Sequence, residues 1–422
     1  MRFLPIIFRK AVKSGTLELR GPGGYVGRFG GDAPGPEVAL RVMDPSLDWK
    51  IALHPELRAA EAIMDGGLVV EEGSIHDFVT LFISNRPRFN RTPSQAFWRA
   101  ASRRSRRFLQ HNPVTRARRN AAHHYDLGNE FYRLWLDSDM QYSCGYWADG
   151  VETLEQAQTA KKRHIAAKLG LEPGMRVLDI GCGWGGMAIY LAAICDVHVT
   201  GITLAGRQLD VARKRADILG LSDRLDFRLQ DYREVGETFD RVVSVGMLEH
   251  VGAPYLPAYF RKVHDCLAPD GVALIHAISA RHPPAVTSAF LRKYIFPGGY
   301  SPVLSETTAA IEKSGLWSLD IELWRVHYAK TLAEWRKRFM AVRGQVVDMY
   351  DDRFARMWEI YLSGSELSFT HGSSMVAQYQ LGRTRDAMPL TRAYLGPAEE
   401  RLRAREVEIG EIACSASRAL GG

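Results

Sequence analysis

One stretch, residues 176–186, limits the fold more than any other part of the chain. Its sequence is RVLDIGCGWGG, an apolar run that breaks at a carboxylate and a cluster of glycines. A helical pattern then continues from Met187 to Ile194, so the stretch predicts a buried strand, a tight turn and a helix. Such a turn brings backbone N–H groups and a helix N-terminus up to a ligand, and glycine permits close approach. The stretch therefore predicts a site for a nucleotide-like cofactor.

The residues around the glycines favour one cofactor over another. Gly181, Gly183 and Gly186 match the dinucleotide pattern G-x-G-x-x-G, which is weak on its own. A dinucleotide site also needs an acidic residue after the second strand, but the predicted strand 198–202 is followed by TLAG. Asp179 instead precedes the first glycine, as in the D-x-G-x-G turn of S-adenosylmethionine-dependent methyltransferases. We expect S-adenosylmethionine, with a dinucleotide or a purely structural turn as alternatives.

Strands and helices alternate from residue 176 onwards. This order predicts an α/β fold with a doubly wound, Rossmann-like parallel sheet. The ligand crevice should then lie beyond the C-terminal strand ends, where Gly181–Gly183, Thr203, Glu249 and His276 fall. The predicted strands are 176–180, 198–202, 225–229, 241–245, 271–277 and 318–325, and the predicted helices are 130–136, 185–194, 205–219, 255–267, 331–343 and 346–362.

A chain of 422 residues that is 46% hydrophobic can bury more than one core, so we expect two domains. Residues 1–88 predict a smaller N-terminal α+β domain, with a structural, dimer-forming or lipid-handling role. Residues 121–390 form the predicted catalytic domain, and 391–422 a charged, peripheral tail. Between the two domains, residues 89–120 predict a basic linker, either solvated or attractive to anionic headgroups, with Arg103, Arg104, Arg106, Arg107, Arg116, Arg118 and Arg119. In the catalytic domain, the aromatic-rich segment 283–300 predicts a substrate lid or a helix packed in the core.

The net charge and the cysteines indicate which partners and which cellular compartment to expect. A net charge of +7 suits an anionic partner such as a phospholipid surface, although it is also an ordinary surface composition. We expect no nucleic acid, because no binding motif or aromatic stacking platform accompanies the charge. The longest apolar run, Met187–Cys195, is too short to cross a bilayer, and the N-terminus does not match a secretory signal. Five cysteines without framework or metal-ligand spacing predict reduced thiols, no metal and a cytoplasmic protein.

Five segments in order resemble the cyclopropane-fatty-acyl-phospholipid synthases and the related mycolic acid cyclopropane synthases and methyltransferases. The resemblance covers about residues 121–390, and the N-terminal domain is similar to the extra domain of the phospholipid-acting branch. The segments are HYDLGN at 124–129, QYSC at 141–144, VLDIGCGWG at 177–185, GMLEHVG at 246–252 and FPGG at 296–299.

The resemblance implies transfer of a methylene from S-adenosylmethionine to the cis double bond of a phospholipid acyl chain. The alkene would attack the sulfonium methyl, and a base would deprotonate the resulting carbocation before ring closure. It also implies a homodimer, and with the charge it suggests a peripheral place on the inner face of the membrane. Alternatives are a sister enzyme that makes methyl-branched or methylene-bearing chains or methylates a modified acyl chain, and a non-catalytic lipid-binding protein.

The resemblance also assigns site residues. In the family the base is a bound bicarbonate ion, and its holders here would be Cys144, Glu249, His276, Ile278 through its backbone N–H, and Tyr328. Taken singly, Cys144 and His276 also fit core packing, and Tyr328 fits a sheet-edge aromatic. The predicted cofactor contacts are Tyr142, Ser143, Asp179, Gly181, Cys182, Gly183, Thr203, Leu204, Gln208, Asp231 and Tyr232, with Cys182 as a small turn residue and not a nucleophile.

Overall fold

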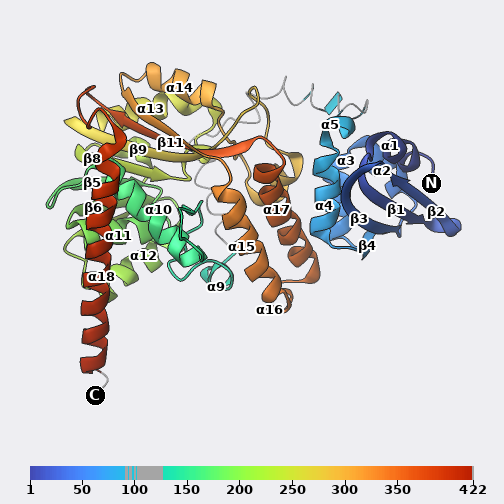
Figure 1. Ribbon diagram of the computed structural model, residues 1–422, viewed down its shortest axis with the longest axis horizontal. Helices are drawn as coiled ribbons and strands as arrows, with labels where there is room; N and C mark the ends of the chain where they lie inside the picture. Colours follow the sequence, from blue (N-terminus) through green and yellow to red (C-terminus); the bar gives the residue numbers. More distant parts are fainter. Residues whose placement is uncertain (91–93, 95–96, 99–100, 102–126, 421–422) are drawn as a thin grey trace. The chain divides into compact units, whose positions relative to one another are not determined.

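Figure 1 shows the computed structural model of the chain, which describes residues 1–90, 94, 97–98, 101 and 127–420. Most of the predicted basic linker and residues 124–126 of the first family segment lie outside these residues. The chain forms two compact units. The first contains Met1–His111, His282–Gly299 and Tyr328–Ser374, and the second contains Asn112–Arg281, Tyr300–His327 and Met375–Gly422.

The first unit is built on a four-stranded sheet of order β2-β1-β3-β4. Strand β1 is parallel to β3 and antiparallel to β2, and β3 is antiparallel to β4. Buried and half-buried residues alternate along β1, as expected when one face of a sheet packs on a core. The strands are β1 Ser14–Gly21, β2 Tyr25–Gly30, β3 Ala33–Val42 and β4 Leu68–Glu72, and the helices of this part are α1 Leu4–Ala11, α2 Leu47–Leu53, α3 Pro55–Met64, α4 Ile75–Ser84 and α5 Arg86–Phe89.

The first unit is discontinuous in sequence because α17 (Asp352–Thr370) packs on α3 and α4. Helices α15 (His327–Ala341) and α16 (Arg343–Met349) precede it. The prediction of one helix over 346–362 is wrong, since the chain breaks after α16 and Asp351 caps α17 by accepting a hydrogen bond from the Phe354 N–H at 2.6 Å. The structure thus adds residues 282–299 and 328–374 to the N-terminal unit, whereas the sequence placed them in the catalytic domain.

The second unit contains a seven-stranded sheet of order β10-β11-β9-β8-β5-β6-β7. Strands β9, β8, β5, β6 and β7 are parallel neighbours, and β10 and β11 are antiparallel to each other. The predicted α/β doubly wound fold is therefore confirmed. The strands are β5 Arg176–Ile180, β6 His198–Thr203, β7 Leu225–Leu229, β8 Phe239–Val245, β9 Leu267–Ala280, β10 Trp317–Trp324 and β11 Ser374–Gly382.

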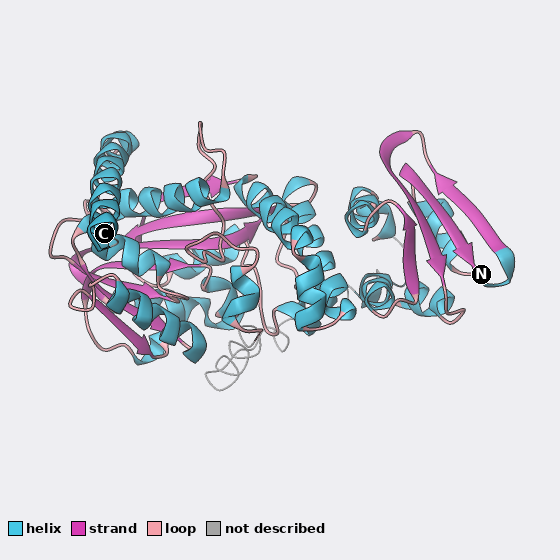
Figure 2. Cartoon of the chain, turned by 90° about the horizontal axis from the view of Figure 1, so that it is seen from below, coloured by secondary structure: helices cyan, strands magenta, loops and turns pink. Residues whose placement is uncertain are grey.

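Helices cover both faces of this sheet (Figure 2), and each face has its own core. Leu178 and Ile180 of β5 pack into the core with α13 and α14, while Val177 packs into the core with α10, α11 and α12. The sequence missed α10 and α14, and it described the C-terminus only as a charged tail where the structure has α18. The helices are α9 Asn129–Arg133, α10 Leu154–Leu169, α11 Gly186–Cys195, α12 Gly206–Ile218, α13 Leu256–Asp265, α14 Leu304–Glu312 and α18 Leu395–Leu420.

Candidate active site

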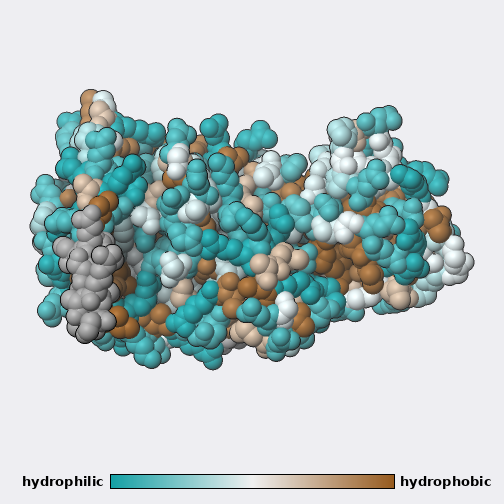
Figure 3. Space-filling model, turned by 60° about the horizontal axis from the view of Figure 1, so that its bottom comes forward, coloured by the Kyte–Doolittle hydropathy of each residue, from teal (hydrophilic) through white to brown (hydrophobic). Residues whose placement is uncertain are grey.

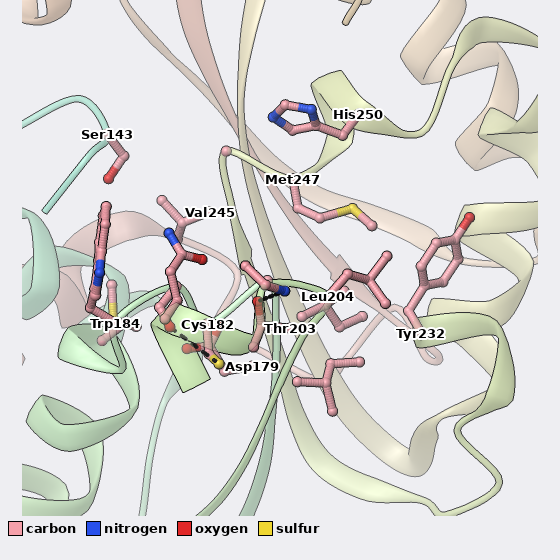
Figure 4. Close-up of a pocket in the computed structure, with 18 of the residues that line it drawn as sticks. Ser143, Asp179, Cys182, Trp184, Thr203, Leu204, Tyr232, Val245, Met247 and His250 are labelled. Atoms are coloured by element: carbon pink, nitrogen blue, oxygen red, sulfur yellow. Dashed lines mark hydrogen bonds between the residues drawn. The ribbon is translucent and has the colours of Figure 1, made fainter. Parts of the chain in front are cut away.

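A pocket lies at the carboxyl ends of the parallel strands of the second unit, where the sequence predicts the ligand crevice (Figure 4). Its wall consists of the turn after β5, the residues that follow β6, β7 and β8, and the segment 140–143. In the close-up, Ser143 and Trp184 lie on one side of the pocket, and Met247 and Tyr232 lie on the other. Met140 on this wall has a φ of +56°, a conformation that costs free energy in a non-glycine residue.

The glycine turn is held by hydrogen bonds from its own backbone. The N–H groups of Gly181 and Cys182 both donate to the Ile202 carbonyl of β6, at 2.9 and 3.0 Å. Gly181 and Gly183 have φ values of +88° and +55°, in the left-handed region that favours glycine. A Cβ at Gly183 would meet no protein atom within 4 Å, so that this backbone position borders the open pocket.

Gly186, the third glycine of the pattern, has a packing role. A Cβ there would lie 2.2 Å from Nε2 of Gln141 and 2.6 Å from Oδ2 of Asp139. The glycine therefore lets the segment 139–141 pack on the start of α11. Lys162 Nζ donates to Asp139 Oδ2 at 2.6 Å, and Arg215 forms an ion pair with the same carboxylate, which fixes this pocket wall further.

Asp179 is a buried carboxyl group directly before the turn. Its side chain is 2% exposed, and its Oδ2 atom has no hydrogen-bond partner among the described residues. Burial raises the pKa of Asp179 to about 7, although the nearby Lys161 acts in the opposite direction. A buried carboxylate oxygen without a partner suits a ligand that brings a cationic donor, as the amino acid end of S-adenosylmethionine does.

The end of β6, which is the second predicted strand of the parallel sheet, carries no acidic residue. Thr203 Oγ1 accepts a hydrogen bond from the Ala205 N–H at 3.1 Å. Thr203 and Leu204 are labelled on this part of the wall in Figure 4, and Ala205 also lines the pocket. The other lining carboxylate, Asp231, is already held by Arg233, whose Nε and Nη2 donate to it at 2.8 and 2.7 Å. A dinucleotide ribose would therefore lack its usual acidic partner here.

The structure brings all the predicted cofactor contacts to this one pocket. Their role as contacts stays a prediction. Burial raises the pKa of the Cys182 thiol well above its ordinary value, which agrees with a turn residue and not a nucleophile. The lining residues predicted from sequence are Tyr142, Ser143, Asp179, Gly181, Cys182, Gly183, Thr203, Leu204, Gln208, Asp231 and Tyr232.

Sequence reasoning missed Lys161, a buried lysine on α10. Its side chain is fully buried, and its Nζ donates to Gln141 Oε1 at 2.7 Å and to Ser143 Oγ at 2.8 Å. Burial lowers the pKa of Lys161 to about 8, against the opposing effect of Asp137. The hydrogen bonds of Lys161 thus fix the segment 141–143 to α10. No local motif marks it, because it stands beside Lys162 in a charged helix.

Glu249 and Ile278, two residues of the predicted anion site, are in direct contact. The Ile278 backbone N–H donates to Glu249 Oε1 at 2.6 Å, and Glu249 Oε2 is buried without a hydrogen-bond partner among the described residues. Burial raises the pKa of Glu249 to about 7, although the Ile278 hydrogen bond lowers it. Glu249 follows β8, so it stands at the same sheet edge as the glycine turn.

His276 and Cys144 are buried in the same unit. His276 on β9 pairs in register with Val245, the last residue of β8, and burial lowers its pKa well below the ordinary value. Cys144 directly follows Ser143 of the pocket wall and is fully buried. His250, which the sequence did not single out, also lines the pocket, and burial lowers its pKa to about 4.

Tyr328, the fifth residue of the predicted anion site, belongs to the first unit, where its ring packs on Trp335 and Phe369. Its part in the anion site stays a prediction. Residues 283–299 of the predicted lid, 283–300, fall in the same unit, whereas Tyr300 belongs to the second unit. The segment contains a short π-helix, η5 Leu291–Ile295. Tyr294 of this segment donates to Glu61 of α3 at 2.9 Å, and its role as a lid also stays a prediction.

Residues 112–379 match the protein family described as mycolic acid cyclopropane synthetase. A probable fatty acid methyltransferase of Pseudomonas putida is 36% identical over 346 residues, which are 80% of this chain and 85% of that protein. The cyclopropane-fatty-acyl-phospholipid synthase of Escherichia coli K12 is 42% identical over 246 residues, 58% of this chain and 63% of that enzyme.

Solved structures agree with the sequence matches. The mycolic acid cyclopropane synthase CmaA1, complexed with SAH and CTAB, superposes with a TM-score of 0.60 at 31% identity, covering 65% of this chain and 99% of that one. The family match over residues 112–379 includes every residue that lines the pocket described above. The chain therefore belongs to the mycolic acid cyclopropane synthetase family, and it is an S-adenosylmethionine-dependent C-methyltransferase of the cyclopropane synthase type.

Proposed function

We propose that the protein transfers a methylene from S-adenosylmethionine to the cis double bond of phospholipid acyl chains, with a bound bicarbonate ion as the base. The observation that carries this proposal is the Glu249 carboxyl group. One of its oxygens is fixed by the Ile278 N–H, and the other is buried without a partner among the described residues. A bicarbonate O–H is a donor that suits such an oxygen.

The surrounding residues suit a small anion in other respects. Because the pKa of Glu249 is near 7, its carboxyl group can be ionised or protonated at neutral pH. A proton shared between this carboxyl group and the bound anion would reduce the repulsion between their negative charges. Bound bicarbonate would supply a general base close to the acyl chain. The protein's own part is to hold that base with Glu249, the Ile278 N–H, His276, Cys144 and Tyr328.

S-adenosylmethionine, when bound, supplies an electrophilic methyl group. We propose that Asp179 pairs with its ammonium group, since Oδ2 of Asp179 is buried and without a partner among the described residues. The turn at Gly181–Gly183 would let the cofactor approach the backbone closely. The segment 140–143, held by hydrogen bonds from Lys161, would form the pocket wall on the same side as Trp184.

A phospholipid substrate requires contact with a membrane surface, and the N-terminal part of the chain has suitable side chains. Figure 3 shows apolar surface, in brown, on this part of the molecule. Ile6 of α1 and Trp49 and Leu53 of α2 are each more than half exposed, and Lys50 Nζ lies 6.0 Å from the Trp49 ring centroid. Exposed aliphatic, aromatic and basic side chains together are typical of interfacial binding. We therefore propose a peripheral place on the inner face of the cytoplasmic membrane.

None of the described helices is long and apolar enough to cross a membrane. A homodimer belongs to the proposal on the strength of the family resemblance alone.

A second candidate differs only in the fate of the carbocation. The Pseudomonas putida relative, which covers most of this chain, is named a probable fatty acid methyltransferase. A methyl-branched or methylene-bearing product would need the same pocket and the same first step. The predicted anion-site residues favour ring closure over a methyl-branched product, because a base placed at the new methyl group directs proton loss there.

Replacing the anion-holding residues tests the proposal. We expect Glu249→Gln and Cys144→Ser to leave the protein folded and able to bind S-adenosylmethionine. Turnover should fall, by about a hundredfold or more for Glu249→Gln, together with the response to added bicarbonate. Calorimetry gives the cofactor affinity, and product analysis in bicarbonate-depleted buffer gives the rate. Glu312→Gln, an exposed carboxylate at the end of α14, is the matched control and should change neither quantity. Loss of cofactor binding in the Glu249 or Cys144 variant would place that residue in the wrong site.

A further inference from the structure

The protonation of His276 is fixed by its neighbours. The imidazole is 2% exposed and packs edge-to-face with Trp324, at 5.0 Å between ring centroids. Burial lowers its pKa well below the ordinary value, and the Lys161 and Lys168 charges add to this effect, so the ring is neutral. A neutral imidazole carries one N–H, on either Nδ1 or Nε2. Which nitrogen carries it decides where the ring can donate a hydrogen bond.

Gln378 of β11 is the partner of the Nδ1 atom. This side chain is fully buried, its Nε2 lies 3.1 Å from His276 Nδ1, and its Oε1 accepts from Lys168 Nζ at 3.0 Å. An ammonium group can only donate, so the amide oxygen must face Lys168 and the amide NH₂ must face His276. An amide NH₂ also only donates. His276 Nδ1 must therefore present its lone pair, and the ring proton is on Nε2.

A further set of charges keeps Lys168 in place. Lys168 of α10 is 1% exposed, and it forms an ion pair with Glu322 of β10. Burial lowers the pKa of Lys168 while Glu322 raises it, and His164 and Lys168 hold the pKa of Glu322 below its ordinary range against the effect of burial. His164 bridges Glu322 and Glu399 of α18, at 2.8 and 2.6 Å. The cation that orients the Gln378 amide is therefore part of a buried network that reaches the C-terminal helix.

We propose that Gln378 and Lys168 are positioning residues that hold the proton of His276 on Nε2, so that the imidazole donates from Nε2 to the anion of the site. The consequence for catalysis rests on the proposed function, whereas the position of the proton does not. With the proton on Nδ1, the Nε2 lone pair would face the anion and repel it. The Gln378 amide prevents this state because it offers Nδ1 only a donor.

The first test observes the proton directly. The full-length protein, labelled with ¹⁵N histidine and without added ligand, is studied by long-range ¹H–¹⁵N NMR, and the His276 signals are assigned by their loss in His276→Asn. We expect a pyrrole-type Nε2 and a pyridine-type Nδ1. In Gln378→Met, which is similar in length but cannot donate, the two nitrogens should move toward averaged shifts. A pyrrole-type Nδ1 in the unmodified protein, or an unchanged ring in Gln378→Met, would overturn the proposal.

The second test asks what the proton position does for the reaction. In Gln378→Met the KM for bicarbonate should rise about tenfold or more, since a hydrogen bond to a charged group is lost, while S-adenosylmethionine affinity stays unchanged. The matched control is Gln380→Met, a residue on the same strand that is equally buried and bonds to the Lys168 carbonyl and to Tyr394. An equal rise in both variants would overturn the positioning role. If the unmodified enzyme needs no bicarbonate, the proposed function fails, and the NMR result alone then decides the inference.

Discussion

At the scale of single residues, two buried carboxyl groups define the predicted chemistry. Burial raises the pKa of both Asp179 and Glu249 to about 7, and each has one oxygen without a partner among the described residues. Because the folded state holds these protons more tightly than the unfolded state, both groups make the protein less stable as the pH rises from about 4 to 7. Buried groups whose shifted pKa lowers the stability of the protein in this way are common at functional sites.

Asp179 also predicts a pH dependence of cofactor binding. The ammonium of S-adenosylmethionine would pair with the ionised carboxylate. At a pH below the Asp179 pKa of about 7, cofactor binding therefore requires the carboxyl group to lose its proton. We expect affinity to rise with pH, by up to about tenfold per pH unit between ~5.5 and ~7, and then to level off. Calorimetric titration at several pH values measures this. Asp179→Asn should bind more weakly and lose the slope. A slope that persists in Asp179→Asn would assign the titration to another group.

At the scale of elements, the turn between β5 and α11 is the part of the site that depends most on backbone shape. Three of its glycines have positive φ, yet they face different surroundings. A Cβ at Gly185 would lie 2.8 Å from the Phe227 ring, whereas one at Gly183 would enter open space. Gly185 therefore serves packing, and Gly183 leaves room for a ligand.

We expect Gly183→Val to weaken S-adenosylmethionine binding at least tenfold, which is about 1.4 kcal/mol or more. The reason is obstruction of the pocket in addition to backbone strain. Gly220→Val separates the two effects, because Gly220 also has a positive φ, +65°, with no atom within 4 Å of a Cβ, but does not line the pocket. Thermal unfolding should report similar destabilisation in both variants. Equal cofactor affinity in the two would remove the turn from the site.

The sequence predicted some elements of the site and missed others for a physical reason. The strand, turn and helix at 176–195 were predictable because apolar periodicity and glycines are local signals. Helix α10 was not, because Lys161, His164 and Lys168 resemble a solvated face in sequence and are buried only through partners distant along the chain. The partner Gln378 of His276 likewise lies on β11, a strand that the sequence missed.

At the scale of the whole molecule, the chain divides into two units that local signals could not delimit. The first unit gathers segments from three parts of the sequence, because α17 packs on α3 and α4. The predicted domain boundary at residue 88 lies close to the segment that the structure does not describe, and the one at residue 120 lies within that segment. Both boundaries stay predictions. The predicted lipid-handling role of the N-terminal part is testable through its exposed apolar side chains.

We expect Leu53→Ser to weaken binding to anionic phospholipid vesicles by about 1 to 2 kcal/mol, because an inserted leucine side chain leaves water. Sedimentation of the protein with vesicles measures the partition. Leu219→Ser is the matched control, since both leucines are 54% exposed but Leu219 lies at the end of α12 in the second unit. Equal losses in both variants, or none in Leu53→Ser, would contradict a membrane role for α2. The arginines of the predicted linker, Arg103, Arg104, Arg106 and Arg107, can be replaced by Gln in the same assay to test their predicted attraction to headgroups.

Mass spectrometry of the acyl chains tests most directly whether the enzyme closes a ring on a lipid double bond, as we propose. The purified protein is incubated with S-adenosylmethionine whose transferred methyl is fully deuterated, and with vesicles of cis-unsaturated phospholipid. We predict acyl chains that gain the labelled carbon, lose one of its deuterons, resist hydrogenation and show a ring by NMR. A gain that retains every deuteron, or one that leaves an alkene, would contradict ring closure and assign the protein to the methyl- or methylene-forming enzymes. No gain at all would contradict the phospholipid substrate.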